Sequence, residues 1–165
     1  MKTSVWVLLI ISTITFLGCE STSHKQAKAR PVDTSPRLKK LSNGASQVVV
    51  DARGEWINTG IEVREGQKLK FKARGDWGES AAVKRNADGG PAGLFGSGYW
   101  GAVPIIPDAP YGALIGRIGG QVFYIGQANT IKAQQGAELQ LAINDAPGNY
   151  EDNHGEMLVT IRKLN

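Results

Sequence analysis

The chain has 165 residues, a formal net charge of +4 and a single cysteine, Cys19. The basic excess lies in the first third, because residues 47–165 carry twelve basic and thirteen acidic residues. A near-neutral domain gives no electrostatic reason to expect a nucleic acid partner, and one cysteine excludes an intramolecular disulfide.

The first eighteen residues, Met1–Gly18, have the features of a secretory signal peptide. Lys2 is followed by an almost wholly apolar run from Val5 to Leu17. As a helix this run would rise about 20 Å, which is short of the roughly 30 Å hydrocarbon core of a bilayer. A charged start, a short apolar stretch and a small residue before the cleavage point are typical of signal peptides.

The four residues Phe16-Leu17-Gly18-Cys19 resemble the lipobox of bacterial lipoproteins. The resemblance implies that Cys19 is acylated and becomes the first residue of the mature protein. Two or more acyl chains anchor a protein stably, whereas one binds only marginally. Glu20 follows the cysteine in place of Asp, so we expect a cell-envelope protein anchored in the outer membrane.

Residues 19–46 are predicted to form the lipidated cysteine and a flexible basic tether. This stretch has few large apolar residues and six basic ones, so it cannot bury enough surface to offset the loss of chain entropy. The tether is either a solvated linker or lies on anionic lipid phosphates.

Residues 47–165 are predicted to form one all-β domain, a β-sandwich or jelly roll of about eight short strands. In Lys68–Gly75, apolar Leu69, Phe71 and Ala73 alternate with lysines, and no segment shows a helical stripe. The other strands are expected at Val48–Ala52, Ile61–Val63, Ala113–Ile118, Val122–Ile125, Thr130–Ala133, Gly136–Asp145 and Met157–Ile161.

Between Trp77 and Tyr111 this alternation fails, and glycines, prolines and aromatic residues dominate. Long irregular stretches inside a compact domain are usually functional or disordered. The segment is therefore interpreted as an ordered binding loop, with a flexible excursion as the alternative.

The segment Asn144–Gly155 (NDAPGNYEDNHG) is the strongest functional signal. It places five oxygen-bearing side chains within ten residues: Asn144, Asp145, Asn149, Asp152 and Asn153. Residues 133–161 hold five acids and no lysine or arginine, which is unfavourable unless protons or a cation neutralise the carboxylates. Calcium prefers such oxygen donors on a flexible loop. The alternative is that Asn, Asp and Gly merely form turns.

This segment resembles the calcium-site loop of the PA-IL-like galactophilic lectins, bacterial proteins that bind galactose through a calcium ion. The resemblance continues in Tyr111–Gly119 (YGALIGRIG) and, more loosely, in Trp56–Ile61 and Ala73–Trp77. It implies a galactose-binding-domain-like sandwich and a calcium ion as the bound cofactor.

By this resemblance, the side chains of Asp145, Asp152 and Asn153 and the backbone carbonyl of Asn149 would bind calcium. Asp145, Asn149 and Asp152 would also contact the sugar. A further carbonyl ligand would come from residues 78–80, where the match fails. The family's His-Pro-x-Gln sugar clamp is absent, and its place falls near Tyr99 and Trp100, whose rings could stack on a sugar or fill the core.

The sequence favours a binding protein over an enzyme. With Cys19 acylated and only two histidines in the chain, a cysteine–histidine or serine–histidine nucleophile has little to work with, and no phosphate-binding glycine loop occurs. We therefore expect a lipid-anchored, calcium-dependent carbohydrate-binding protein whose sugar is possibly galactose. The alternative is a structural envelope lipoprotein whose calcium loop stabilises the fold or a protein contact.

Overall fold

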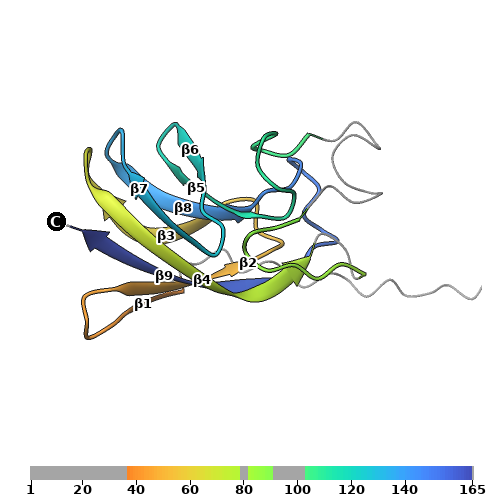
Figure 1. Ribbon diagram of the computed structural model, residues 1–165, viewed down its shortest axis with the longest axis horizontal. Coiled ribbons are helices and arrows are strands. Elements are labelled where there is room, and N and C mark those ends of the chain that lie inside the picture. The colour runs from red at the N-terminus through yellow and green to blue at the C-terminus, as the bar shows by residue number, and fades with distance from the viewer. Residues whose placement is uncertain (1–36, 79–81, 91–102, 165) are drawn as a thin grey trace, which may run out of the picture.

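The computed structural model describes residues 37–78, 82–90 and 103–164, which form nine strands in two antiparallel sheets (Figure 1). The five-stranded sheet has the order β1-β2-β9-β4-β7 and the four-stranded sheet the order β3-β8-β5-β6. The strands are β1 (Leu38–Lys40), β2 (Ser46–Asp51), β3 (Ile57–Val63), β4 (Lys68–Gly78), β5 (Leu114–Ile118), β6 (Gln121–Tyr124), β7 (Ala128–Lys132), β8 (Ala137–Ile143) and β9 (His154–Leu164).

The β-sandwich prediction is confirmed. Each of the eight expected strands corresponds to one of β2 to β9, with ends that shift by a few residues. The alternation that predicted them is visible in the burial of side chains, since β3 buries every second residue. Because successive side chains of a strand point to opposite faces, each sheet offers one apolar face to its partner.

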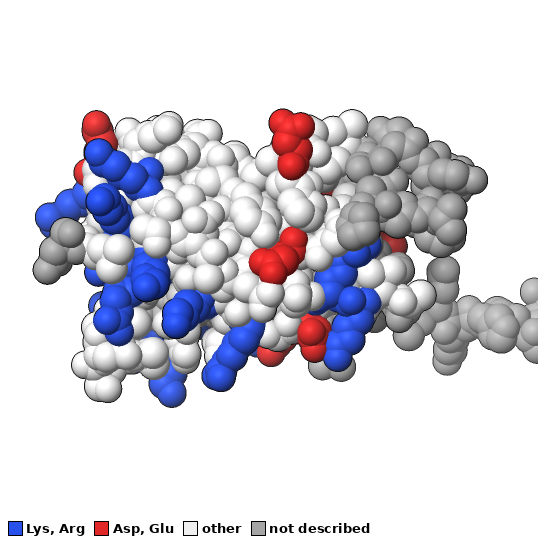
Figure 2. Space-filling view, viewed as in Figure 1, with Lys and Arg blue, Asp and Glu red and all other residues white. Residues whose placement is uncertain are grey.

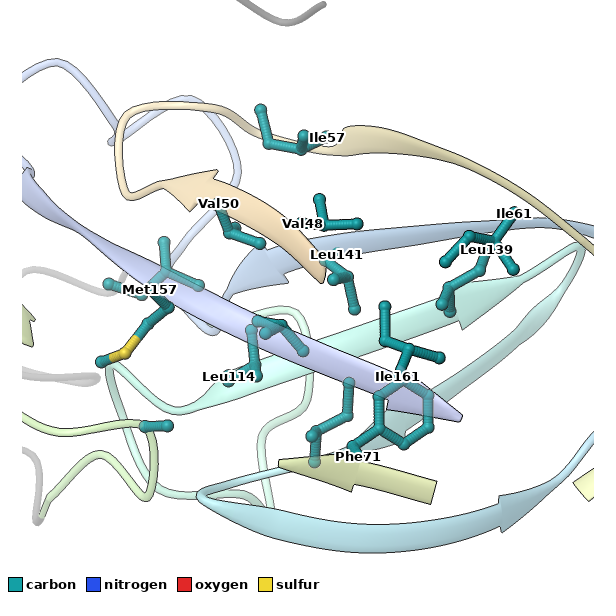
Figure 3. Packing of buried hydrophobic residues seen from close by; sticks show 14 of the residues in the cluster. Val48, Val50, Ile57, Ile61, Phe71, Leu114, Leu139, Leu141, Met157 and Ile161 are labelled. Atoms are coloured by element: carbon teal, nitrogen blue, oxygen red, sulfur yellow. The ribbon is translucent and has the colours of Figure 1, made fainter. Parts of the chain in front are cut away.

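The core lies between the two sheets (Figure 3). Figure 3 shows Val48, Phe71, Met157 and Ile161 of one sheet packing toward Ile57, Ile61, Leu114, Leu139 and Leu141 of the other. All of these side chains are at most 5% exposed. Full burial of an aliphatic or aromatic side chain contributes about 1.5–3 kcal/mol, so this cluster is the main source of stability.

The folded part begins earlier than the boundary expected at residue 47. β1, which lies in the stretch assigned to the tether, pairs with β2 through Leu38↔Val48 and Lys40↔Ser46. Sequence reasoning missed β1 because it has three residues and one apolar side chain. Cys19 and the expected signal peptide lie outside the described residues. Within those residues, no helix is long and apolar enough to cross a bilayer.

Candidate metal centre

Residues 144–153 connect β8 to β9 at one end of the sandwich, the right-hand end in Figure 1. Two successive turns shape this loop. Asn149 N donates to Ala146 O (3.0 Å), and Asn153 N donates to Tyr150 O (3.3 Å). Gly148, with φ +86°, follows Pro147, and this order of residues suits a type II turn, which needs positive φ at its third position.

Asp145 lies at the inner end of the loop and is 1% exposed. Its Oδ1 accepts hydrogen bonds from Ala146 N (2.6 Å) and from the Tyr111 hydroxyl. Burial raises the pKa of this carboxyl, and the Asp152 carboxylate adds to the rise, while hydrogen bonds from Tyr111, Ala146 and Asn153 partly offset it. A nearby cation would favour the ionised form.

Asn153 closes the loop and is 3% exposed. Its Nδ2 donates to Ala52 O at 3.0 Å, which fixes the amide group. Its Oδ1, however, is buried and has no hydrogen-bond partner, and the same is true of the Tyr150 hydroxyl. A buried oxygen without a partner costs about 1–3 kcal/mol of folding free energy. Asn153 Oδ1 can therefore accept a hydrogen bond or bind a cation.

Asp152 and Asn149 are exposed on the same loop. The loop therefore combines two buried oxygen donors, Asp145 and Asn153, with two donors that face solvent. No group of three or more His, Cys, Asp or Glu that could hold a metal occurs in residues 37–78, 82–90 and 103–164. The expected site is of a different kind, because only two of its donors are carboxylates and the others are amide or carbonyl oxygens, as calcium accepts.

Asn144 was counted among the oxygen donors, but the structure gives it another role. Its Nδ2 donates to the carbonyls of Ile106, Ala109 and Pro110, and its Oδ1 accepts from Ile106 N. Since both ends of the amide are used, Asn144 pins residues 106–110 against the end of β8 and is not free to bind an ion.

Three contributors to the site were missed at the sequence level. The Tyr111 hydroxyl holds Asp145, Tyr150 contributes an unpartnered hydroxyl, and the Trp77 indole Nε1 donates to Gly112 O at 2.7 Å. Trp77 ties the end of β4 to the backbone beside Tyr111. A buried polar aromatic residue needs a partner, but no local spacing could have shown which one.

The irregular character expected for residues 77–111 is confirmed in the described residues 82–90 and 103–110, which make only isolated bridges, at Trp77↔Arg85 and Gly90↔Tyr111. Trp77 and Gly78 themselves still belong to β4. Ile105 N also donates to Asp145 O at 3.1 Å, so this segment abuts the candidate centre. Tyr99 and Trp100 lie outside the described residues. So do Glu79 and Ser80, the positions considered for a further carbonyl ligand.

Comparison with known proteins supports the fold. No family model and no curated protein matches the chain. Among solved structures, a protein described as "EclA N-terminal domain; PllA-like lectin" superposes with a TM-score of 0.57, covering 77% of this chain and 98% of that chain at 20% identity. The chain shares the fold of a lectin domain. At this identity the likeness concerns the sandwich alone.

The turn at Gly148 offers a test of the loop geometry. We expect Gly148→Ala to lower the free energy of unfolding by about 1–2 kcal/mol, because a residue with a Cβ is strained at positive φ. The change should also weaken stabilisation by calcium, since the turn positions Asn149. Thermal melts with and without calcium measure both effects.

Gly66→Ala is the matched control. Gly66 has φ +76°, and a Cβ would meet nothing within 4 Å at either glycine. Gly66 lies in the β3–β4 turn, remote from the loop in sequence and sheet position. The Gly66→Ala variant should therefore lose a similar free energy of unfolding, and calcium should stabilise it as much as it stabilises the unmodified chain. Equal calcium responses in both variants would contradict the role given to the turn.

Proposed function

We propose that the protein is a calcium-dependent carbohydrate-binding domain, anchored by lipid at Cys19 in the cell envelope. The observation that carries the proposal is the unpartnered buried Oδ1 of Asn153. Asn153 lies at one end of the loop, and the buried carboxylate of Asp145 lies at the other. An unpartnered buried amide oxygen beside a buried carboxylate, with a second carboxylate on the same loop, is a donor set that suits a hard cation.

In this proposal Asp145, Asp152 and Asn153 donate side-chain oxygens and Asn149 its backbone carbonyl. Tyr111 and Ala146 both donate to Oδ1 of Asp145, so Oδ2 is the oxygen that we assign to the ion. When bound, calcium supplies a positive centre that two neighbouring sugar hydroxyls can approach. Asp152 is exposed and can accept a hydrogen bond from one of those hydroxyls. Asp145 holds the inner side of the site.

The resemblance of the loop to PA-IL-like lectins and the shared fold with a PllA-like lectin domain both support carbohydrate as the ligand class. The sugar-side residues remain Asp145, Asn149 and Asp152, with Tyr99 and Trp100 as candidate stacking rings. Galactose is the sugar that the resemblance suggests.

A second candidate function is a structural one, in which calcium only stabilises the loop or a protein contact. The observation that favours it is the burial of Asp145 and Asn153, which are 1% and 3% exposed. A ligand on two buried side chains stabilises the fold whether or not a sugar ever reaches it.

A glycan array separates the two functions. The full chain is applied in calcium and again in excess chelator. We expect binding to a subset of glycans in calcium and none in chelator. Binding that persists in chelator would contradict the role of the ion, and no binding under either condition would favour the structural function.

The anchor is tested independently of the sugar. Cells that express the chain are fed a palmitate analogue, and incorporation is compared with that in a Cys19→Ala variant. We expect label in the unmodified protein and none in the variant, because acylation requires the thiol. Unlabelled wild-type protein would contradict the anchor and leave the carbohydrate proposal intact.

A further inference from the structure

The outer face of the five-stranded sheet carries an unusual concentration of positive charge. Lys68, Lys70, Lys72 and Arg74 alternate with core residues along β4, and all four side chains are exposed. The cross-strand register adds residues from both neighbouring strands and from β1 to the same face. We call this set the basic face: Lys39, Lys68, Lys70, Lys72, Arg74, Lys132 and Arg162.

The register also places like charges directly opposite one another. Lys70 pairs with Arg162 and Lys68 pairs with Lys132. Such cross-strand pairs are destabilising, and the packing of the core does not require them, since these side chains point away from it. In the described part of the chain, no carboxylate forms an ion pair with any residue of the basic face.

The acidic residues of this face gather at its other end and are already neutralised. Asp76, Glu156 and Asp51 lie side by side in register where β9 begins. Each forms an ion pair: Asp76 with Lys84, Glu156 with Arg37 and Asp51 with Arg53. The neighbouring acids are therefore paired with cations outside the basic face, and no carboxylate among the described residues compensates the positive charge of the basic face.

Two adjacent hollows lie among these cations. One of about 350 Å³ is lined by Lys70, Lys72, Thr160 and Arg162 together with Asn43, Ala45 and Leu164. The other, of about 330 Å³, is lined by Gln47, Lys72, Ala73, Arg74 and Thr160. Figure 2 shows lysine and arginine side chains along the left side and lower edge of the molecule, over the region of β4 and β9, and a separate group toward the right beside acidic side chains.

We propose that the basic face docks on the phosphate groups of an anionic membrane surface. The charges are spread over several strands of a sheet, as a planar partner requires, and are not confined to one row. Each lysine or arginine close to an anionic leaflet contributes attraction, and an acyl chain with a polybasic patch is a recognised two-part anchor.

The length of chain that precedes the sheet favours this partner. Cys19 lies 18 residues before Arg37, a stretch that spans no more than about 65 Å even when fully extended. This step rests on the proposed acylation of Cys19, which would keep the basic face close to the bilayer. The candidate metal centre lies at the end of the sandwich, so docking would leave its exposed Asp152 accessible.

Lysine footprinting of the full chain on vesicles tests the proposal. The chain is bound to vesicles of phosphatidylcholine, with or without phosphatidylglycerol, and treated with a water-soluble acetylating reagent. We expect Lys70, Lys72 and Lys132 to react about threefold more slowly on the anionic vesicles, because the face is covered. Lys40 and Lys163, exposed but outside the basic face, should react alike on both. High salt, which shortens the Debye length to about 3 Å at 1 M, should abolish the protection.

Two double variants make the result specific. Lys70→Gln with Arg162→Gln removes one opposed pair and should abolish the protection of Lys72 and Lys132. Lys40→Gln with Arg64→Gln removes the same charge elsewhere and should leave it unchanged. Equal reactivity of Lys70, Lys72 and Lys132 on both vesicle types would overturn the proposal. The proposal would also be overturned if dissolved dextran sulfate slowed the acetylation of these lysines while anionic vesicles did not. That result would make the face a site for soluble polyanions. Chelator should change none of these results, so failure of the calcium proposal is distinguishable.

Discussion

Asn144→Asp should be among the most destabilising single substitutions in the domain, with a loss of about 4 kcal/mol or more at neutral pH. The Asn144 amide nitrogen donates to three carbonyls, and an aspartate would turn carboxylate oxygens toward the same carbonyls. Each buried polar group left without a partner costs about 1–3 kcal/mol, and more when it is charged. Urea unfolding of the full chain at neutral pH measures the effect.

Asn58→Asp is the matched control for that substitution. Asn58 lies on the exposed face of β3, and its Oδ1 accepts from Gln140 Nε2 at 2.6 Å, a role that a carboxylate can also fill. The same chemical change should therefore alter the free energy of unfolding by less than about 0.5 kcal/mol. Similar losses in both variants would contradict the role of Asn144 as the residue that holds segment 106–110.

Asp145→Asn should abolish stabilisation by calcium. A ligand at a hundredfold excess over its Kd stabilises the folded state by about 2.7 kcal/mol, which corresponds to about 10 °C in the melting midpoint of a domain near this size. Extracellular calcium modules bind in roughly the 10⁻⁴ to 10⁻³ M range, so a large excess is needed. We expect this rise in the unmodified chain and no rise in the variant, as measured by thermal melts.

Without calcium the same substitution should not reduce stability. Burial raises the pKa of Asp145 above its ordinary value of 3.8. The folded state therefore binds a proton more readily than the unfolded state, and the ion-free protein loses stability as pH rises through that window. Asparagine removes this loss. An ion-free variant less stable than the ion-free wild type at neutral pH would contradict this account.

Asp88→Asn provides the contrast. Asp88 is a half-buried carboxylate whose pKa is lowered by hydrogen bonds, first of all from the Gln127 side-chain amide to Oδ2. Its Oδ1 also accepts from Gln127 N (2.8 Å) and from the Tyr124 hydroxyl (3.3 Å). It lies outside the candidate centre. Its replacement should lower the melting midpoint equally with and without calcium, which separates loss of a structural carboxylate from loss of a metal ligand.

Most of the sandwich could be predicted because period-two alternation is a local signal. The burial pattern of β3 and β4 follows directly from their sequences, and the Pro147-Gly148 turn is readable in the same way. β1 was not predictable, because its stability depends on pairing with β2 rather than on its own residues. Strand boundaries moved by a few residues for the same reason.

The candidate site was predictable only as a segment. Sequence placed Asp145 and Asn153 on one loop, but it could not show that both are buried or that Asn144 faces away toward residues 106–110. The Tyr111–Asp145 hydrogen bond joins residues 34 positions apart. Such a contact is set by the register of the sheets and by the Trp77–Gly112 bond, which no local pattern encodes.

Calorimetric titration of the calcium-loaded full chain with galactose, glucose and mannose tests the central claim most directly. Few protein contacts to the sugar are expected, since the family's additional clamp is absent, so the account predicts a Kd of about 1 mM for one of these sugars, equivalent to about −4 kcal/mol. The heat should disappear in chelator and in Asp152→Ala. Calcium binding with no heat from any of the three sugars, at concentrations well above the millimolar range, would contradict the carbohydrate function and favour the structural one.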